Sequence, residues 1–158
     1  MPTYGIIDSQ SAKTVLASEE RGIDGGKKIK GRKRHIVVDT QGNLLAVVVH
    51  AANIHDTKSG INPARKAFVK YPTIEKFCGD DGYRKSFEQD VLTELGLGVD
   101  ISKRIKPQFE ILPKRWVVER TFGWANHSRR LYKDVEIKTQ HEENMFVISH
   151  LHTLLKRY

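Results

Sequence analysis

The chain has 158 residues, which is room for one domain with a sizeable hydrophobic core and little room for two. Its 27 Lys and Arg against 19 Asp and Glu give a formal net charge of +8, which favours a polyanionic partner such as nucleic acid, although a merely basic protein shows the same excess. The single cysteine, Cys78, excludes an internal disulfide and a zinc site with several cysteines, and no apolar run is long enough to span a membrane.

The first part of the chain contains β-branched runs that are typical of strands. Residues 4–8 predict a short buried strand that ends on a carboxylate, whereas residues 11–31 are polar and glycine-bearing and predict a loop. Two strong strands are expected at residues 35–39 and 44–50. The polar link 40–43 between them contains a glycine, so we expect these two strands to form a hairpin.

Helices and strands are expected to alternate in the middle of the chain. Residues 56–69 can form a helix with Asp56 as its N-cap, and residues 74–78 predict a fourth short strand in which Cys78 is a small core residue. Residues 86–95 predict a second helix, which Ser86 caps and which the following glycines end.

The last third of the chain is predicted to be mainly helical. A fifth strand at residues 99–105 and a proline-bounded link at 107–113 precede a long helix from about 114 to 131. A last helix, from about 140 to 156, has apolar residues at helical spacing: Met145, Ile148, Leu151 and Leu155. Helices placed both between and after strands imply an α/β domain, with a mixed sheet flanked by helices.

Three acidic residues stand out because of their places in this order: Asp8 ends the first strand, Asp80 follows the fourth, and Glu119 lies in the long helix. Strand ends converge on one edge of an α/β sheet, and a packed helix can bring a third carboxylate there. Such carboxylates repel one another unless hard cations such as Mg²⁺ or Mn²⁺ neutralise them. An isolated Asp after a strand, however, is more commonly a turn or cap residue.

The helix that carries Glu119 has two different faces at about 100° per residue. One broad face is apolar apart from two hydroxyls: Val117, Thr121, Trp124, Ala125, Ser128 and Leu131. The opposite side carries Arg115, Glu119, Asn126 and Arg130, and Arg115 lies one turn before Glu119, close enough to pair with it. An ordinary solvated face with one ion pair would show the same pattern.

Three ordered segments of the chain, 7–11, 79–84 and 116–124, resemble the three motifs of DDE transposases, and the branch they resemble is the insertion sequence five group. Further segments that fit the resemblance are 24–35, 50–56 and 129–131. The resemblance covers nearly the whole chain. It implies a ribonuclease H-like fold, a metal-binding triad of Asp8, Asp80 and Glu119, and a match of Arg115 to the arginine of the third motif. Asp80 matches the family pattern better than its neighbour Asp81.

The implied activity is metal-dependent DNA strand cleavage and strand transfer at the ends of an insertion sequence, with two Mg²⁺ or Mn²⁺ ions. The implied partners are DNA, further copies of the chain in the active complex, and possible products of an upstream reading frame. The expected location is the bacterial cytoplasm, at the nucleoid. Residues 1–158 would form one catalytic domain without the helical N-terminal region that family members carry.

Two positions depart from the family pattern: Leu112 stands in place of a tyrosine, and Asn126 in place of a lysine or arginine. Arg129 and Arg130 are candidates to replace the cation missing at Asn126. Two other functions therefore stay open, a noncatalytic DNA-binding remnant of a transposase and a ribonuclease H-like nuclease that only hydrolyses DNA.

Several cations are candidates to contact DNA phosphates without reading sequence. The densest cluster is Lys27, Lys28, Lys30, Arg32, Lys33 and Arg34. The long helix and the segment after it add Arg120, Arg129 and Arg130. A solvated loop without a partner is the alternative for the dense cluster.

Other polar and aromatic residues receive structural assignments. We expect Trp124 in the core, Trp116 and Phe122 either in packing or stacked on a base, and His50 and His55 in structural roles. Asp39, like Asp56, is expected to serve a turn or a helix cap.

Overall fold

The computed structural model describes residues 1–102 and 115–157. Leu112, the predicted link 107–113 and the last part of the strand predicted at 99–105 lie outside the described residues. Described strands form one six-stranded mixed sheet: β1 Tyr4–Lys13, β2 Gly22–Asp24, β3 Ile29–Val38, β4 Leu44–Ala51, β5 Lys76–Asp80 and β6 Gly98–Ser102. Described helices are α1 Asp56–Ser59, α2 Ile61–Lys70, the 3₁₀ turn η1 Asp81–Tyr83, α3 Ser86–Leu95, α4 Arg115–Asn126 and α5 Thr139–Arg157. None of these helices is both long and apolar enough to cross a membrane.

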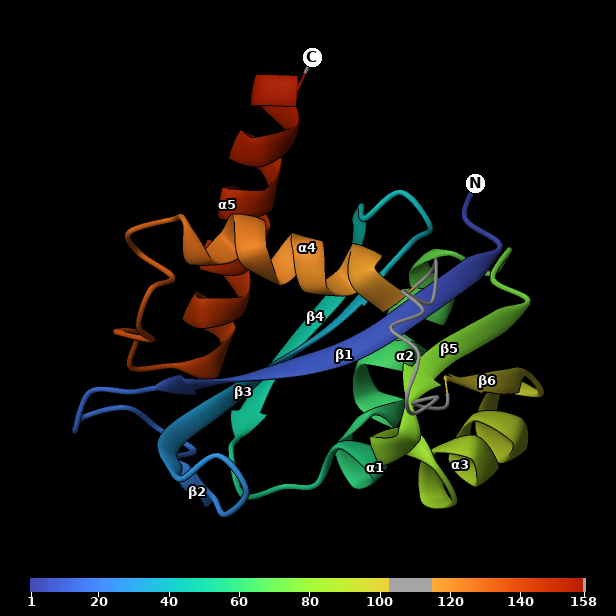
Figure 1. Cartoon of the computed structure of the whole chain (residues 1–158), viewed down its shortest axis with the longest axis horizontal. Helices are drawn as coiled ribbons and strands as arrows, with labels where there is room; N and C mark the ends of the chain where they lie inside the picture. The colour runs from blue at the N-terminus through green and yellow to red at the C-terminus, as the bar shows by residue number, and fades with distance from the viewer. Residues whose placement is uncertain (103–114, 158) are drawn as a thin grey trace, which may run out of the picture.

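Strand β1 lies between an antiparallel half and a parallel half of the sheet (Figure 1). It pairs antiparallel with β3, which also pairs with β2 and β4. On its other side β1 pairs parallel with β5, and β5 pairs parallel with β6. The predicted α/β class and the mixed sheet are therefore confirmed.

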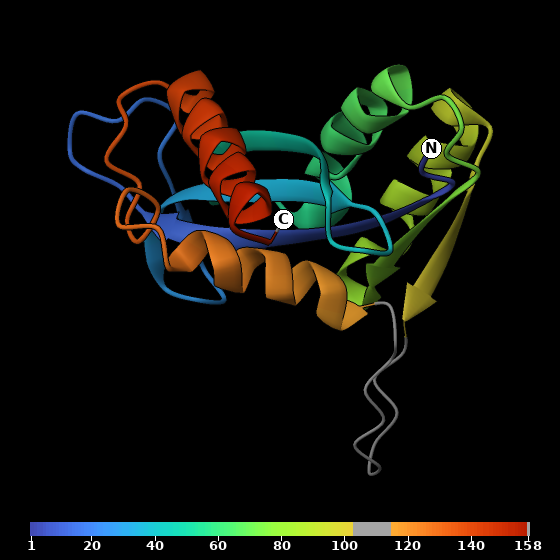
Figure 2. The ribbon, with the colours of Figure 1, turned by 90° about the horizontal axis from the view of Figure 1, so that it is seen from above.

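Helices cover both faces of the sheet (Figure 2). One core cluster joins inward residues such as Ile7 and Val37 to α2 and α3, and the other joins Ile6 and Ile36 to α4 and α5. Neighbouring residues of one strand thus serve opposite cores, as the alternation of side chains along a strand requires. Cys78 is buried and free.

The predicted hairpin at residues 40–43 is confirmed. The Asp39 amide donates to the Asn43 carbonyl at 3.0 Å, and β3 and β4 run antiparallel on either side. Asp39 is a turn residue as expected, because its Oδ1 accepts the Gln41 and Asn43 amides at 2.8 and 2.9 Å. Gly42 has φ +88°, a conformation that L side chains rarely adopt, which explains the glycine of this turn.

The loop predicted over residues 11–31 is wrong, because β1 continues to Lys13, β2 lies inside the segment, and β3 begins at Ile29. The hydrophobic pattern did not predict these strands, because most of their residues within 11–31 are polar or glycine. Gly31 permits the close approach of β1 and β3, since a Cβ there would lie 1.9 Å from the Ala12 carbonyl oxygen.

Strand β3 buries four consecutive polar residues, and these alternate between the two faces of the sheet. The Arg32 guanidinium donates twice to the Asp134 carboxylate, at 2.7 Å for each bond, and Arg34 Nε donates to Glu142 Oε1 at 2.6 Å. Lys33 and His35 point to the other face. The predicted DNA contacts of Arg32, Lys33 and Arg34 are therefore wrong, because these side chains are buried and their charges are paired within the protein: Arg32 with Asp134, Lys33 with Asp56 and Arg34 with Glu142.

Helix boundaries differ from the predictions where a polar side chain has a tertiary partner. The segment 56–69 forms α1 and α2 rather than one helix, and its N-cap is His55. Asp56 does not cap the helix, because its carboxylate accepts bonds from β1 and β3 instead. Ser86 is the first residue of α3 rather than its cap, and its hydroxyl bonds to Thr57 at 3.0 Å.

Helices α4 and α5 also bury faces other than those expected. Helix α4 ends at Asn126 and buries Val118 and Phe122, whereas Trp124 is only partly buried, so its assignment to the core is wrong. In α5 the buried residues are Glu142, Phe146, Ser149 and His150, while Ile148, Leu151 and Leu155 are exposed. Two polar contacts set the rotation of α5 about its axis: Glu142 pairs with Arg34, and His150 Nε2 accepts the Leu44 amide at 3.0 Å.

We predict that Asp134→Ala lowers the free energy of unfolding by ~3–5 kcal/mol, because it leaves the Arg32 guanidinium buried without its counter-charge. Glu94→Ala is the matched control, since Glu94 pairs with Arg65 at the surface and its loss should cost about 1 kcal/mol or less. Urea unfolding of both variants measures the difference. Equal destabilisation of the two would contradict the structural role assigned to Arg32.

Candidate active site

The register between β1 and β5 brings two of the three predicted carboxylates level with each other. Ile6 of β1 pairs with Cys78 of β5 in the parallel ladder. Asp8 and Asp80 each lie two residues further along these strands, so both project from the same side of the sheet at the same height. Helix α4, which carries Glu119, lies across β1 near this point (Figure 1).

Asp8 occupies an environment that disfavours its charge. Burial, together with the negative charges of Asp80 and Asp56, raises the pKa of Asp8 to about 7. The Ser9 amide, which donates to Asp8 Oδ1 at 2.8 Å, and the Arg115 guanidinium act in the opposite direction. A cation beside Asp8 would therefore stabilise its ionised form.

Arg115 supplies positive charge between the other two carboxylates. Its Nη2 lies 3.5 Å from Asp80 Oδ2 and 3.6 Å from Glu119 Oε1. The predicted pair of Arg115 and Glu119 is therefore present, and the same guanidinium also reaches Asp80. Glu119 remains 57% exposed, so its side chain has room to reorient.

The carboxylates do not form a closed metal cage. Within residues 1–102 and 115–157, no three His, Cys, Asp or Glu side chains gather closely enough to hold an ion. The donor set at this edge of the sheet is nevertheless oxygen only, the type that hard divalent cations prefer. Binding an ion between Asp80 and Glu119 would require the Arg115 guanidinium to move aside.

Asp80 and its neighbour Asp81 have different surroundings. Asp80 Oδ1 accepts the Gly82 amide at 2.8 Å, which leaves Oδ2 toward Arg115. Asp81 is exposed and pairs with Arg84 at 2.6 Å. Of these two residues, Asp80 is therefore the one that the structure places beside Arg115.

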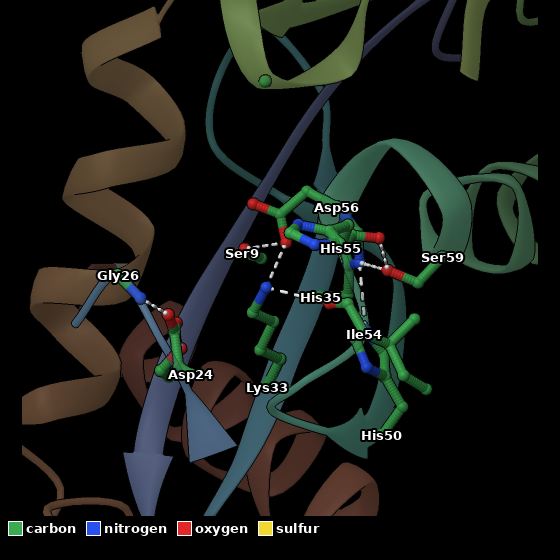
Figure 3. A network of polar contacts seen from close by, with 12 residues as sticks. Ser9, Asp24, Gly26, Lys33, His35, His50, Ile54, His55, Asp56 and Ser59 are labelled. Carbon is green, nitrogen blue, oxygen red and sulfur yellow. Dashed lines mark hydrogen bonds and ion pairs between the residues drawn. The ribbon is translucent and has the colours of Figure 1, made fainter. Parts of the chain in front are cut away.

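A polar network (Figure 3) holds β1 at Ser9, the residue that follows Asp8. Asp56 Oδ1 accepts the Ser9 hydroxyl at 2.9 Å and the Lys33 ammonium at 3.0 Å, and Lys33 also donates to the Ile54 carbonyl at 2.9 Å. These contacts tie α1, β1 and β3 together next to the candidate site. The sequence does not predict this network, and its only signal there is that the members fall in the segments that carry the family resemblance.

His35 continues this network into the core. Its Nδ1 lies 3.2 Å from Nε2 of His50, which Figure 3 also labels. His35 Nε2 lies 2.7 Å from the Tyr83 hydroxyl. Burial lowers the pKa of His35 to about 3, so the ring is neutral at pH 7. The Tyr83 ring packs against Gly79, where it fills the space that a Cβ would need. This contact holds the turn after Asp80 in place. His55, in contrast, is exposed.

The remaining cations considered for DNA contact lie at the surface or close to it. Lys27, Lys28 and Lys30 are exposed in and beside the turn between β2 and β3, and Arg129 and Arg130 are exposed after α4, where Arg130 pairs with Glu136. Arg120 stacks on the rings of Trp116 and Trp124 and donates to the Gln41 carbonyl at 2.6 Å. Asn126 accepts a bond from Gln10 at 3.0 Å.

Similarity to known proteins identifies the family of this chain. Residues 2–154 match the sequence profile described as the transposase DDE domain. The chain belongs to this family. A curated relative from Burkholderia cepacia, the proposed transposase of insertion sequence element IS402, is 34% identical over 111 residues, a match that covers 64% of this chain and 52% of the relative. The chain thus spans about half the length of that relative.

The structural comparison confirms the fold. The catalytic core domain of BIV integrase superposes with a TM-score of 0.54 at 11% identity, over 96% of this chain and 82% of the integrase chain. That domain has a ribonuclease H-like fold, so the expected ribonuclease H-like architecture of this DDE domain is confirmed. Membership of the insertion sequence five group stays a prediction.

We predict that His35 contributes a loss of stability as the pH falls below about 6.5, the ordinary pKa of histidine, whereas the raised pKa values of Asp8 and Glu142 act in the opposite direction over the same range. The unfolded chain binds a proton at this residue while buried His35 stays neutral down to pH about 3, so falling pH favours the unfolded state. The contribution of His35 is about 1.4 kcal/mol per pH unit within this window.

Between pH 7 and 5, urea unfolding should therefore show that the free energy of unfolding of His35→Gln rises relative to that of the wild type as the pH falls. His55→Gln is the control, because His55 is exposed. An unchanged pH dependence in His35→Gln would contradict the assignment.

Proposed function

We propose that this DDE domain cleaves DNA strands at the ends of an insertion sequence and joins the freed end to target DNA, with divalent metal as cofactor. The observation that carries the proposal is the placement of Asp8 and Asp80 at one height on adjacent parallel strands, with Glu119 and Arg115 on α4 beside them. Membership of the transposase DDE domain family supports the same activity.

Asp8, Asp80 and Glu119 would hold the metal, with two Mg²⁺ or Mn²⁺ ions as the expected complement. Two features of the structure fit this role. The three side chains offer only oxygen donors, and the Arg115 guanidinium already lies between two of them as a positive charge. When bound, such ions activate a water or a 3′-hydroxyl and stabilise the leaving oxygen of the phosphodiester.

Other groups of the chain position these carboxylates. The Ser9 amide orients Asp8, and the Gly82 amide orients Asp80. Glu119 is exposed and able to turn toward an ion. Arg115 orients Glu119, and its guanidinium would be available to a DNA phosphate if it moved away from the carboxylates.

The partners that follow from this proposal are the element ends, the target DNA and further copies of the chain in the active complex. Because the chain spans about half of its curated relative, we include a product of an upstream reading frame among the proposed partners. The proposed location is the cytoplasm, at the nucleoid.

We predict that alanine at Asp8, Asp80 or Glu119 reduces Mg²⁺-dependent strand cleavage to background, while folding and metal-free DNA binding stay close to wild type. The physical reason is the loss of a carboxylate ligand from an ion that neutralises the others. Asp81→Ala is the matched control, because Asp81 pairs with Arg84 rather than Arg115, and it should cleave like the wild type. The assay uses end-labelled element termini with Mg²⁺ or with EDTA.

Continued metal-dependent cutting by Asp8→Ala would overturn the proposed site. Cleavage by the wild type without joined products, in the presence of the upstream product, would indicate a nuclease that only hydrolyses. Binding without any cleavage under the same conditions would indicate a noncatalytic remnant.

A further inference from the structure

A hollow of about 460 Å³ lies where the end of α4 meets the C-terminal half of α5. Figure 1 shows the two helices crossing on one side of the molecule, away from α1 and α3. Trp124 and Ser128 line the hollow from the α4 side, and Ser149 and Thr153 line it from α5. The hollow is distinct from the edge of the sheet that carries Asp8 and Asp80.

The charged side chains that line this hollow are all basic. Arg129, Lys156 and Arg157 line it together with His127 and His152, and no Asp or Glu of the described residues does so. None of the three cations forms an ion pair in the part of the chain that the structure describes, whereas Arg32, Lys33 and Arg34 all do. Like charges so grouped repel one another, and an anion between them would relieve the repulsion.

Trp124 helps to hold one of these cations in place. The Arg157 guanidinium lies 4.8 Å from the Trp124 ring centroid, and the Arg120 guanidinium lies 4.6 Å from it. Stacking on an aromatic face orients a guanidinium and leaves its N–H groups free at the edge, where a phosphate oxygen can bind. A helix C-terminus favours Lys156 and Arg157 by itself, but this explanation does not cover Arg129 or the two histidines.

We propose that this hollow binds a phosphate of the DNA backbone, with Arg129, Lys156 and Arg157 as its ligands. This inference rests on the proposed function, since it gives a second contact to the DNA that the domain cleaves. Trp124 follows Glu119 by five residues, about 7.5 Å along the helix axis. The same helix thus presents the candidate active site near one end and the phosphate site at the other.

The test is the salt dependence of DNA binding by the full chain, measured by anisotropy of a labelled duplex in metal-free buffer. Each neutralised phosphate contributes about −0.9 to the slope of log affinity against log salt. Lys156→Ala and Arg129→Ala should each make the slope shallower by about 0.9 and weaken binding at low salt. Lys70→Ala is the matched control, since Lys70 is an exposed lysine of α2 outside the hollow, and its slope should equal that of the wild type.

Trp124 provides a second readout. In a Trp116→Phe background it is the only tryptophan, so the duplex should change its fluorescence, and Lys156→Ala should shift that titration to higher DNA concentration. Inorganic pyrophosphate is the small-anion probe. If pyrophosphate changes the fluorescence in a Lys156-dependent way while the DNA slope is the same in all variants, the hollow is a small-anion site and the proposal fails.

Failure of this proposal is separable from failure of the proposed function. Unchanged slopes in Lys156→Ala and Arg129→Ala, with metal-dependent cleavage intact, would overturn the phosphate site alone. Shallower slopes in these variants, with no cleavage by the wild type under any condition, would support the phosphate site and overturn the activity.

Discussion

The fold depends on the pairing of charges that strand β3 carries into the interior. Arg32 and Arg34 face one side of the sheet and bind Asp134 and Glu142, while Lys33 faces the other side and binds Asp56. A buried charge without a partner costs several kcal/mol, so each cation requires the element that carries its counter-ion to dock in one position. These pairs therefore link the antiparallel half of the sheet to α1, to α5 and to the segment between α4 and α5.

The candidate active site follows from the same constraint. Asp56 binds Lys33 and Ser9 through one oxygen, so the strand position next to Asp8 is held from the β3 side. From the β5 side, Tyr83 lies under Gly79 and bonds to His35, which holds the turn that contains Asp80. The two carboxylates sit on a rigid support, whereas Glu119 on α4 is exposed. The candidate site thus combines two fixed carboxylates with a third that has room to reorient.

Electrostatics also explains why the carboxylates stand apart. Without a divalent cation, three negative charges in one place repel, and burial together with the neighbouring carboxylates raises the pKa of Asp8 to about 7. Arg115 relieves this repulsion by lying between Asp80 and Glu119, where its distances of 3.5 and 3.6 Å are those of loose ion pairs. The cations at 32–34 serve the interior, whereas Arg129, Lys156 and Arg157 line the hollow between α4 and α5.

The sequence by itself determined the α/β class, the hairpin at 40–43, the helix at 86–95 and the three motifs that place Asp8, Asp80 and Glu119 in order. These features are local: they rest on β-branched runs, on a glycine at positive φ and on residues adjacent in the chain. Only the tertiary structure decided that residues 29–35 form a buried strand, that α5 turns Glu142 rather than Leu151 inward, and that Arg115 reaches Asp80. Each of these outcomes depends on a partner far along the chain, because a polar residue can be buried only where another part of the fold supplies its counter-charge or hydrogen bond.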